Sequence, residues 1–261
     1  WGGNTYTYDA VAQLAALTTT DGDWAYLYTA DDERLVAVTT IGGTVARRFS
    51  LRGLGGKVLT QFTLSGADQV GNWTRQRDYI YAGGRLIASD GIEGTRHYHP
   101  DHLGTPRVIT DDLGDIVAEH DYLPYGEEIT DPTRNALPHK FTEHERDLHG
   151  AGTADDLDYM HARLYIPHLG RFSSADTYRG VRGFPQSFNR YSYVHGNPLT
   201  LVDPDGRVPL LAILALEEAT RTVLGYSVMS IGVSLVAAGG WVADRGRHRA
   251  GGWMILSGVG V

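Results

Sequence analysis

A unit of about 20 residues repeats through the first half of the chain, and this repeat limits the fold more than any other feature of the sequence. The stretch "TYTYDAVAQLAALTTTDG" at 5–22 is followed by "AYLYTADDERLVAVTTIGG" at 25–43, which places Tyr6 in register with Tyr26. Side chains that alternate with a period of two lie on opposite faces of a β-strand, and the Asp and Gly residues between the runs favour tight turns. Each unit therefore predicts a β-hairpin.

Weaker copies of the same unit follow at 47–66, 77–94 and 96–116. A single hairpin cannot bury its apolar face, so the units must pair into a larger sheet or wind around something. The 33 Gly and 15 Tyr residues also suit strands joined by turns better than long helices. We therefore expect an all-β protein.

Charge and cysteine content exclude some classes of function. The net charge is -8, with 31 acidic residues against 23 Lys and Arg, and this balance argues against a nucleic-acid binder. The absence of Cys excludes disulfides and thiolate metal sites but leaves the compartment open. The first residues, "WGGNTYTYDA", lack an initiator Met and a signal pattern, so we expect the sequence to begin inside a longer protein.

Three further blocks carry a family resemblance. They are "YHPDHLGTPRVITDDLGDIVAEHDYLPYGE" (98–127), "MHARLYIPHLGRFSSAD" (160–176) and "FNRYSYVHGNPLTLVDPDG" (188–206). With the tyrosine repeats, they resemble the Tyr-Asp (YD) repeat and Rhs-associated core domain of Rhs proteins, Tc-toxin C components and related polymorphic toxins. The resemblance covers residues 1–206 and is specific, because the three blocks occur in the family's order.

The resemblance implies YD-repeat hairpins that spiral into a hollow shell with a core plug at one end. Residues 1–96 would form shell strands, 97–207 the core domain with its boundary motif at 198–207, and 208–261 the start of a variable effector region. The implied function is to enclose and deliver that effector as a toxin. The implied partners are the enclosed effector and components of a secretion apparatus or toxin complex, with no nucleic acid. The implied location is secreted or at the surface of a bacterium.

The family also implies aspartyl-type self-cleavage just after the boundary motif. Two neighbouring carboxylates cannot both ionise cheaply, so one keeps a proton while the other acts as a base. Carried over by motif, the catalytic candidates are Asp176, Asp203 and Arg171. The cleavage motif comprises Pro198, Asp203, Pro204, Gly206 and Arg207, with Asp205 a weaker candidate. No cofactor is implied.

Two departures from the family pattern leave enzyme activity open. Arg207 stands where the family usually has Leu, and Thr177 stands where it usually has Pro. A charged side chain in an apolar slot loses binding, which would suspend cleavage. The alternative interpretation is that 203–206 form an ordinary turn and that Arg171 and Asp176 make an ordinary ion pair. The arginines of 161–172 would then pair between strands.

Nine of the 11 His residues lie between 97 and 168, and His97 and His99 fall on one face of an expected strand. With Asp101 or His102 they have the spacing of a metal site. A His-x-His beside a turn is more often partly exposed sheet, so we predict no metal. Residues 131–158 are charged and without a clear period, and we expect an exposed loop or a short helix.

The amino-acid composition changes abruptly after Arg207. Residues 208–222 predict a helix, and 223–243 hold 21 residues without a charge, about the length that crosses a bilayer. Membrane contact through 223–243 and lining of the shell interior both remain open. The alternative function is a teneurin-like or wall-associated surface protein that uses the shell for adhesion without cleavage. Arg207 favours this alternative, and the apolar tail favours toxin delivery.

Overall fold

The computed structural model describes residues 4–53, 55–65, 73–131, 137–149, 156–180, 182–207 and 210–211. These residues fall into two compact units. One comprises the described residues up to Asp176 and from Tyr191 onward, and the other those within Thr177–Arg190. Both large sheets belong to the first unit, while the second holds a short 3-10 turn, η4 (Pro185–Phe188).

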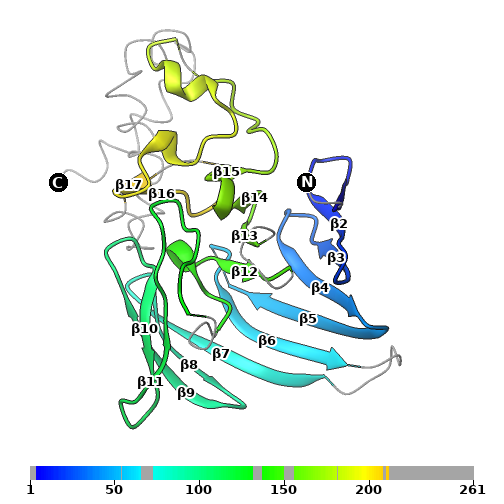
Figure 1. Cartoon of the computed structure of the whole chain (residues 1–261), viewed down its shortest axis with the longest axis vertical. Helices are drawn as coiled ribbons and strands as arrows, with labels where there is room; N and C mark the ends of the chain where they lie inside the picture. The colour runs from blue at the N-terminus through cyan, green and yellow to red at the C-terminus, as the bar shows by residue number, and fades with distance from the viewer. Residues whose placement is uncertain are drawn as a thin grey trace, which may run out of the picture. The chain divides into compact units, whose positions relative to one another are not determined.

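The main sheet of the first unit has eleven strands, and each is paired with the next one in the sequence (Figure 1). All of these pairings are antiparallel. The strands are β1 (Thr5–Tyr8), β2 (Leu14–Thr18), β3 (Asp23–Tyr28), β4 (Arg34–Ile41), β5 (Thr44–Arg52), β6 (Val58–Ser65), β7 (Thr74–Ala82), β8 (Arg85–Gly91), β9 (Gly94–Pro100), β10 (Pro106–Thr110) and β11 (Ile116–Glu119). This sheet confirms the predicted all-β fold and the predicted hairpins, and it continues across residue 97.

Two kinds of turn connect the strands. Gly42 and Gly43 both have positive φ, as the two-residue turn between β4 and β5 requires. The wider turns span five residues, such as 9–13 and 29–33, and the amide of the first residue donates to the carbonyl of the fifth. The fourth residue of these turns is left-handed, and a β-bulge lies next to the turn. The Asp- and Gly-containing gaps between the repeats encode these two geometries.

A second sheet of four antiparallel strands comprises β12 (Glu145–Asp147), β13 (Leu157–Met160), β14 (Arg163–Ile166) and β15 (Arg171–Phe172). Short 3-10 turns lie beside it: η2 (Phe141–Glu143), η3 (Pro167–Leu169) and η5 (Val194–Gly196). A further hairpin pairs β16 (Leu201–Val202) with β17 (Leu210–Leu211). The helix predicted for 208–222 is therefore wrong at Leu210 and Leu211, because their backbones pair with β16.

Apolar side chains from the two large sheets form a shared core. Leu17 and Trp24 of the main sheet cluster with Leu157, Tyr159 and Leu164 of the smaller one. Tyr26, in the register position predicted from the repeat, is 4% exposed and belongs to the same cluster. The tyrosines of the repeat therefore hold the smaller sheet against the main one.

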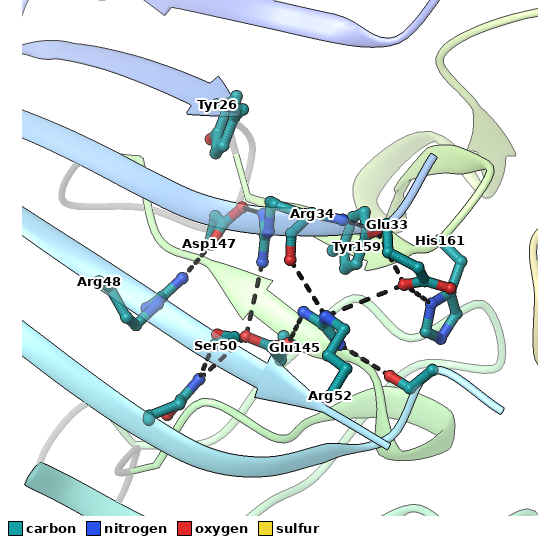
Figure 2. Close-up of polar contacts among 12 residues, drawn as sticks. Tyr26, Glu33, Arg34, Arg48, Ser50, Arg52, Glu145, Asp147, Tyr159 and His161 are labelled. Atoms are coloured by element: carbon teal, nitrogen blue, oxygen red, sulfur yellow. Dashed lines mark hydrogen bonds and ion pairs between the residues drawn. The ribbon is translucent and has the colours of Figure 1, made fainter. Parts of the chain in front are cut away.

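Buried ion pairs complete this contact (Figure 2). Glu145 and Asp147 alternate along β12 and both reach arginines of β4 and β5. Asp147 lies 2.6 Å from Arg48 and also pairs with Arg34, whereas Glu145 pairs with Arg52. Burial alone would raise the pKa of Glu145, but Arg52 and Arg34 hold that pKa well below its usual value.

This network corrects the prediction for 131–158. The described residues 137–149 are mostly buried, so this segment is not an exposed loop. Its charges are tolerated because arginines of the main sheet neutralise them inside the contact. Such partners are distant in sequence, and a local charge pattern does not reveal them.

Candidate active site

The boundary motif comprises the segment before β16, the strand β16 and the described loop residues 203–207 that follow it. Asp203 follows β16 directly and is 1% exposed. The amide of Arg207 donates to Oδ1 of Asp203 (2.9 Å) and to Oδ1 of Asp205 (3.1 Å). The two carboxyl groups therefore close the turn predicted for Asp203–Gly206, and they hold the backbone of Arg207 beside Asp203.

The motif is packed against the turn between β13 and β14. Gly206 has a φ of +69°, and a Cβ there would lie 2.1 Å from the carbonyl oxygen of Met160. Only glycine fits this approach. The amide of Ala162 donates to the carbonyl of Asp205 (3.2 Å), and Nε of Arg163 donates to the carbonyl of Gly206.

Arg163 brings the two predicted carboxylates together. Its Nη2 lies 3.0 Å from Oδ2 of Asp176 and 3.5 Å from Oδ2 of Asp203. The guanidinium also lies over the ring of Phe172, with its carbon 3.6 Å from the ring centroid. Since Arg163, Asp176 and Asp203 are 7%, 15% and 1% exposed, the cluster is largely shielded from water.

Arg171, the arginine predicted from the sequence, lies elsewhere. It is exposed, and its guanidinium is 4.7 Å from the ring centroid of Tyr191. Arg163 is one of the arginines of 161–172 that we expected only to pair between strands. A signal was available, since Arg163 and Tyr165 alternate on β14 and Tyr165 is fully buried.

The two carboxyl groups lie in different electrostatic surroundings. Burial, together with the negative charge of Asp205, raises the pKa of Asp203 to about 8 against the opposing effect of Arg163. Burial also lowers the pKa of Arg163, which Asp176 and Asp203 oppose. At neutral pH Asp203 therefore carries a proton, while Asp176 faces the guanidinium. Two-carboxylate hydrolysis uses one carboxyl group that keeps its proton, and the buried Asp203 meets this requirement.

Strained backbone surrounds the motif. Thr142 and Val194 have φ values of 49° and 41°, which β-branched residues rarely adopt. Nδ1 of His144 lies 2.9 Å from Oγ1 of Thr142, and Nε2 lies 3.4 Å from the carbonyl oxygen of Pro204. Burial, aided by His161, lowers the pKa of His144 to about 3, so this imidazole is neutral. Left-handed residues of this kind concentrate at functional sites.

The remaining motif residues take different positions. Pro198 is buried in the segment before β16. Arg207 is exposed, and its Nη2 lies 3.7 Å from Oδ2 of Asp32 in the β3–β4 turn. The side chain of Arg207 therefore does not occupy a buried apolar slot, although the resemblance placed a Leu-type slot at this position.

The histidines of the suggested metal pattern have other partners. His97 pairs with Asp112 (3.4 Å), and Nε2 of His99 lies 3.2 Å from Oγ1 of Thr110. Among the described residues, no three His, Cys, Asp or Glu side chains are grouped for a metal.

No helix in the described part of the chain is long and apolar enough to span a membrane. The membrane segment suggested for 223–243 lies outside the described residues.

Comparison with known proteins connects this fold to toxins. No family model matches the chain. It is 28% identical over 215 residues to the tRNA3(Ser)-specific nuclease WapA of Bacillus spizizenii, covering 81% of this chain and 9% of that protein. It is 33% identical over 119 residues to Salivary gland surface protein 1 of Aedes aegypti, covering 44% and 3%. Toxin subunits of Yersinia entomophaga and the toxin protein Tse5 of Pseudomonas aeruginosa are further homologues.

Among solved structures, the crystal structure of TcdB2–TccC3–Cdc42 matches with a TM-score of 0.61 at 23% identity. The match covers 83% of this chain and 11% of that one, and at this identity it shows a shared fold. The chain thus shares its fold with part of the TcdB2–TccC3 structure and has toxin components among its homologues. It spans at most about a tenth of the length of these relatives.

Proposed function

We propose that this chain is part of a toxin shell that encloses and delivers an effector region starting after residue 207, and that it cuts itself between Arg207 and Val208. The observation that carries self-cleavage is the placement of Asp176 and Asp203 on one guanidinium beside the boundary motif. The homologous toxin components and the eleven-stranded sheet support the role of a shell.

The remaining proposals follow from this role. Residues 1–96 belong to the shell, 97–207 to the core with its boundary motif, and 208–261 to the enclosed region. The partners are that region and the other components of a toxin complex, as in the TcdB2–TccC3 assembly. A bacterial toxin of this kind acts outside the producing cell, so the location is secreted or at the cell surface.

The chemistry is hydrolysis of one peptide bond. Water adds to the carbonyl carbon of Arg207 while Asp176 takes a proton from that water and Asp203 gives its proton to the carbonyl oxygen. The C–N bond to Val208 then breaks. Its nitrogen receives the proton from Asp176, and a hydroxyl of the intermediate returns a proton to Asp203. One water is consumed, and the products are a carboxyl group on Arg207 and an amine on Val208.

Two contacts support these roles. Asp203 accepts a hydrogen bond from the amide of Arg207, the residue whose carbonyl is attacked. Arg163 binds the carbonyl of Gly206 and contacts the side chains of Asp176 and Asp203, so it keeps both acids beside the backbone of the motif. Arg163 is thus the arginine that we assign to the site, in place of Arg171.

The test is the denatured mass of the full chain. We expect the wild type to split after Arg207, and Asp176→Asn, Asp203→Asn and Arg163→Ala to stay whole. Arg171→Ala and the exposed control Asp112→Asn should split as the wild type does. A wild-type chain that stays intact on prolonged incubation would contradict self-cleavage.

An intact wild type would favour the second candidate, a teneurin-like or wall-associated surface protein that adheres without cleavage. The similarity to Salivary gland surface protein 1 favours this candidate, since its name places it at a surface. Surface display together with an uncut chain would support adhesion. Toxicity of residues 208–261 expressed alone would support delivery.

A further inference from the structure

The β3–β4 turn, residues 29–33, contacts the candidate site with two adjacent acidic side chains. Asp32 lies 3.7 Å from Arg207. Glu33 lies 2.8 Å from Nδ1 of His161, in the β13–β14 turn on which the motif packs (Figure 2). One turn of the main sheet therefore contacts both the motif and its support.

The backbone conformation of Asp32 is one that glycine adopts more easily than aspartate. Asp32 is the fourth residue of its turn and has a φ of +64°. Gly104 and Gly114 occupy the same position in two other turns with the same hydrogen bonds. Glycine adopts this conformation without strain, whereas aspartate only tolerates it. The contact with Arg207 gives a reason for aspartate at this position.

The turn is also held firmly in place. The amide of Thr29 donates to the carbonyl of Glu33 (2.8 Å), and the buried side chain of Gln13 donates to the carbonyl of Asp32 (3.1 Å). Burial alone would raise the pKa of Glu33, but His161 and Arg52 bring that pKa below its ordinary value. Arg207 therefore faces a fixed turn that carries two negative charges.

We propose that Asp32 is the specificity-determining residue of self-cleavage: its carboxylate binds the Arg207 side chain, so that the main sheet selects a cation at the cut position. This inference rests on the proposed function. It accounts for arginine where the resembled motif has leucine, because the partner of Arg207 is an exposed carboxylate instead of an apolar slot. Glu33 and His161 keep the turn beside the motif.

Self-cleavage provides the first measurement. Asp32→Gly should slow the appearance of the fragment about two- to fivefold, the range expected for an exposed ion pair. Ala12→Gly is the matched control, since Ala12 holds the same turn position with a φ of +67° and is exposed. Asp32→Arg should slow cleavage further, and adding Arg207→Asp should restore it above either single variant. Equal rates for wild type and Asp32→Gly would overturn the proposal.

Trypsin provides a measurement that does not depend on self-cleavage. Trypsin must draw an arginine into its own acidic pocket, so Asp32 competes with it for Arg207. In a chain kept whole by Asp176→Asn, Asp32→Gly should speed trypsin cutting after Arg207 about two- to fivefold, and Ala12→Gly should not. If the wild type never cuts itself, the same comparison in the wild-type background still decides the role of Asp32. Unchanged trypsin rates would contradict it.

Discussion

At the scale of single residues, burial and neighbouring charge decide what each carboxyl group of the site can do. Asp203 is buried beside Asp205 and keeps its proton, whereas Asp176 faces Arg163. The same residue types at the surface, such as Asp78 beside Arg75, make only an exposed ion pair. The chemistry of the site therefore depends on where each aspartate is placed as well as on its identity.

The pKa of Asp203 predicts how self-cleavage and stability change with pH. Since this pKa is about 8 in the folded chain, Asp203 loses its proton above that pH, and the cleavage rate should fall there. Unfolded aspartate titrates near about 4. The folded state thus binds more protons between these values, so the unfolding free energy should decrease from pH 4 to 8 and then level off.

Urea unfolding between pH 5 and 9 tests this dependence, with Asp203→Asn for comparison. The amide does not titrate, so the variant should lose the part of the slope that Asp203 causes. An identical slope in the two proteins would show that Asp203 ionises in the folded chain at its ordinary pKa.

Gly206 predicts a second effect of one residue. Gly206→Ala places a methyl group 2.1 Å from the carbonyl oxygen of Met160, at a φ of +69°. We expect about 2–4 kcal/mol of destabilisation and loss of cleavage. Gly114→Ala, at a φ of +86° with no atom within 4 Å, has only the backbone strain and should cost about 1–2 kcal/mol. Urea unfolding measures the stability of both variants, and denatured mass measures their cleavage. Equal losses of unfolding free energy would mean that the backbone at Gly206 can shift away from Met160.

At the scale of elements, β12 shows how a charged segment becomes part of the interior. Its acidic side chains are buried and pair with Arg34, Arg48 and Arg52 on β4 and β5 (Figure 2). Buried pairs of this kind contribute little net stability over apolar packing, but a half-broken pair is costly. They therefore specify how β12 sits on the main sheet.

Removing one charge from this contact should destabilise the folded chain. Glu145→Gln leaves Arg52 buried beside an uncharged partner, and we expect a loss of about 3–5 kcal/mol in the free energy of unfolding. Asp78→Asn, which breaks the exposed pair with Arg75, should leave the free energy of unfolding nearly unchanged. Urea denaturation compares the two. Similar small losses would show that water reaches the contact around β12.

At the scale of the whole molecule, the two large sheets should unfold as one cooperative body, because they share a core. Leu17 of the main sheet is fully buried in the cluster that contains Tyr159 of the smaller sheet. A unit with a shared core opens together, and its amide protons then exchange with a common free energy. The candidate site belongs to this body, since Arg163 lies on β14 of the smaller sheet and contacts both Asp176 and Asp203.

Leu17→Ala tests this cooperativity. It should lower the free energy of unfolding by about 2–5 kcal/mol and reduce amide protection equally in β2 and β13. Leu27→Ala, at a side chain that is 58% exposed, should leave both nearly unchanged. Hydrogen exchange followed by mass spectrometry reads each strand separately. Loss of protection in β2 alone would show that the sheets open independently.

The sequence by itself determined the local structure. The period of two and the Asp and Gly gaps set strands, turns and their order, because these depend on neighbouring residues. The motifs also singled out Asp176 and Asp203, whose catalytic role remains a prediction. Only the tertiary structure decided which arginine joins them, why 137–149 is buried and what Arg207 meets. Each of these depends on pairing across β-strands distant in the chain, where Arg163, Arg34 and Asp32 find partners that no local pattern encodes.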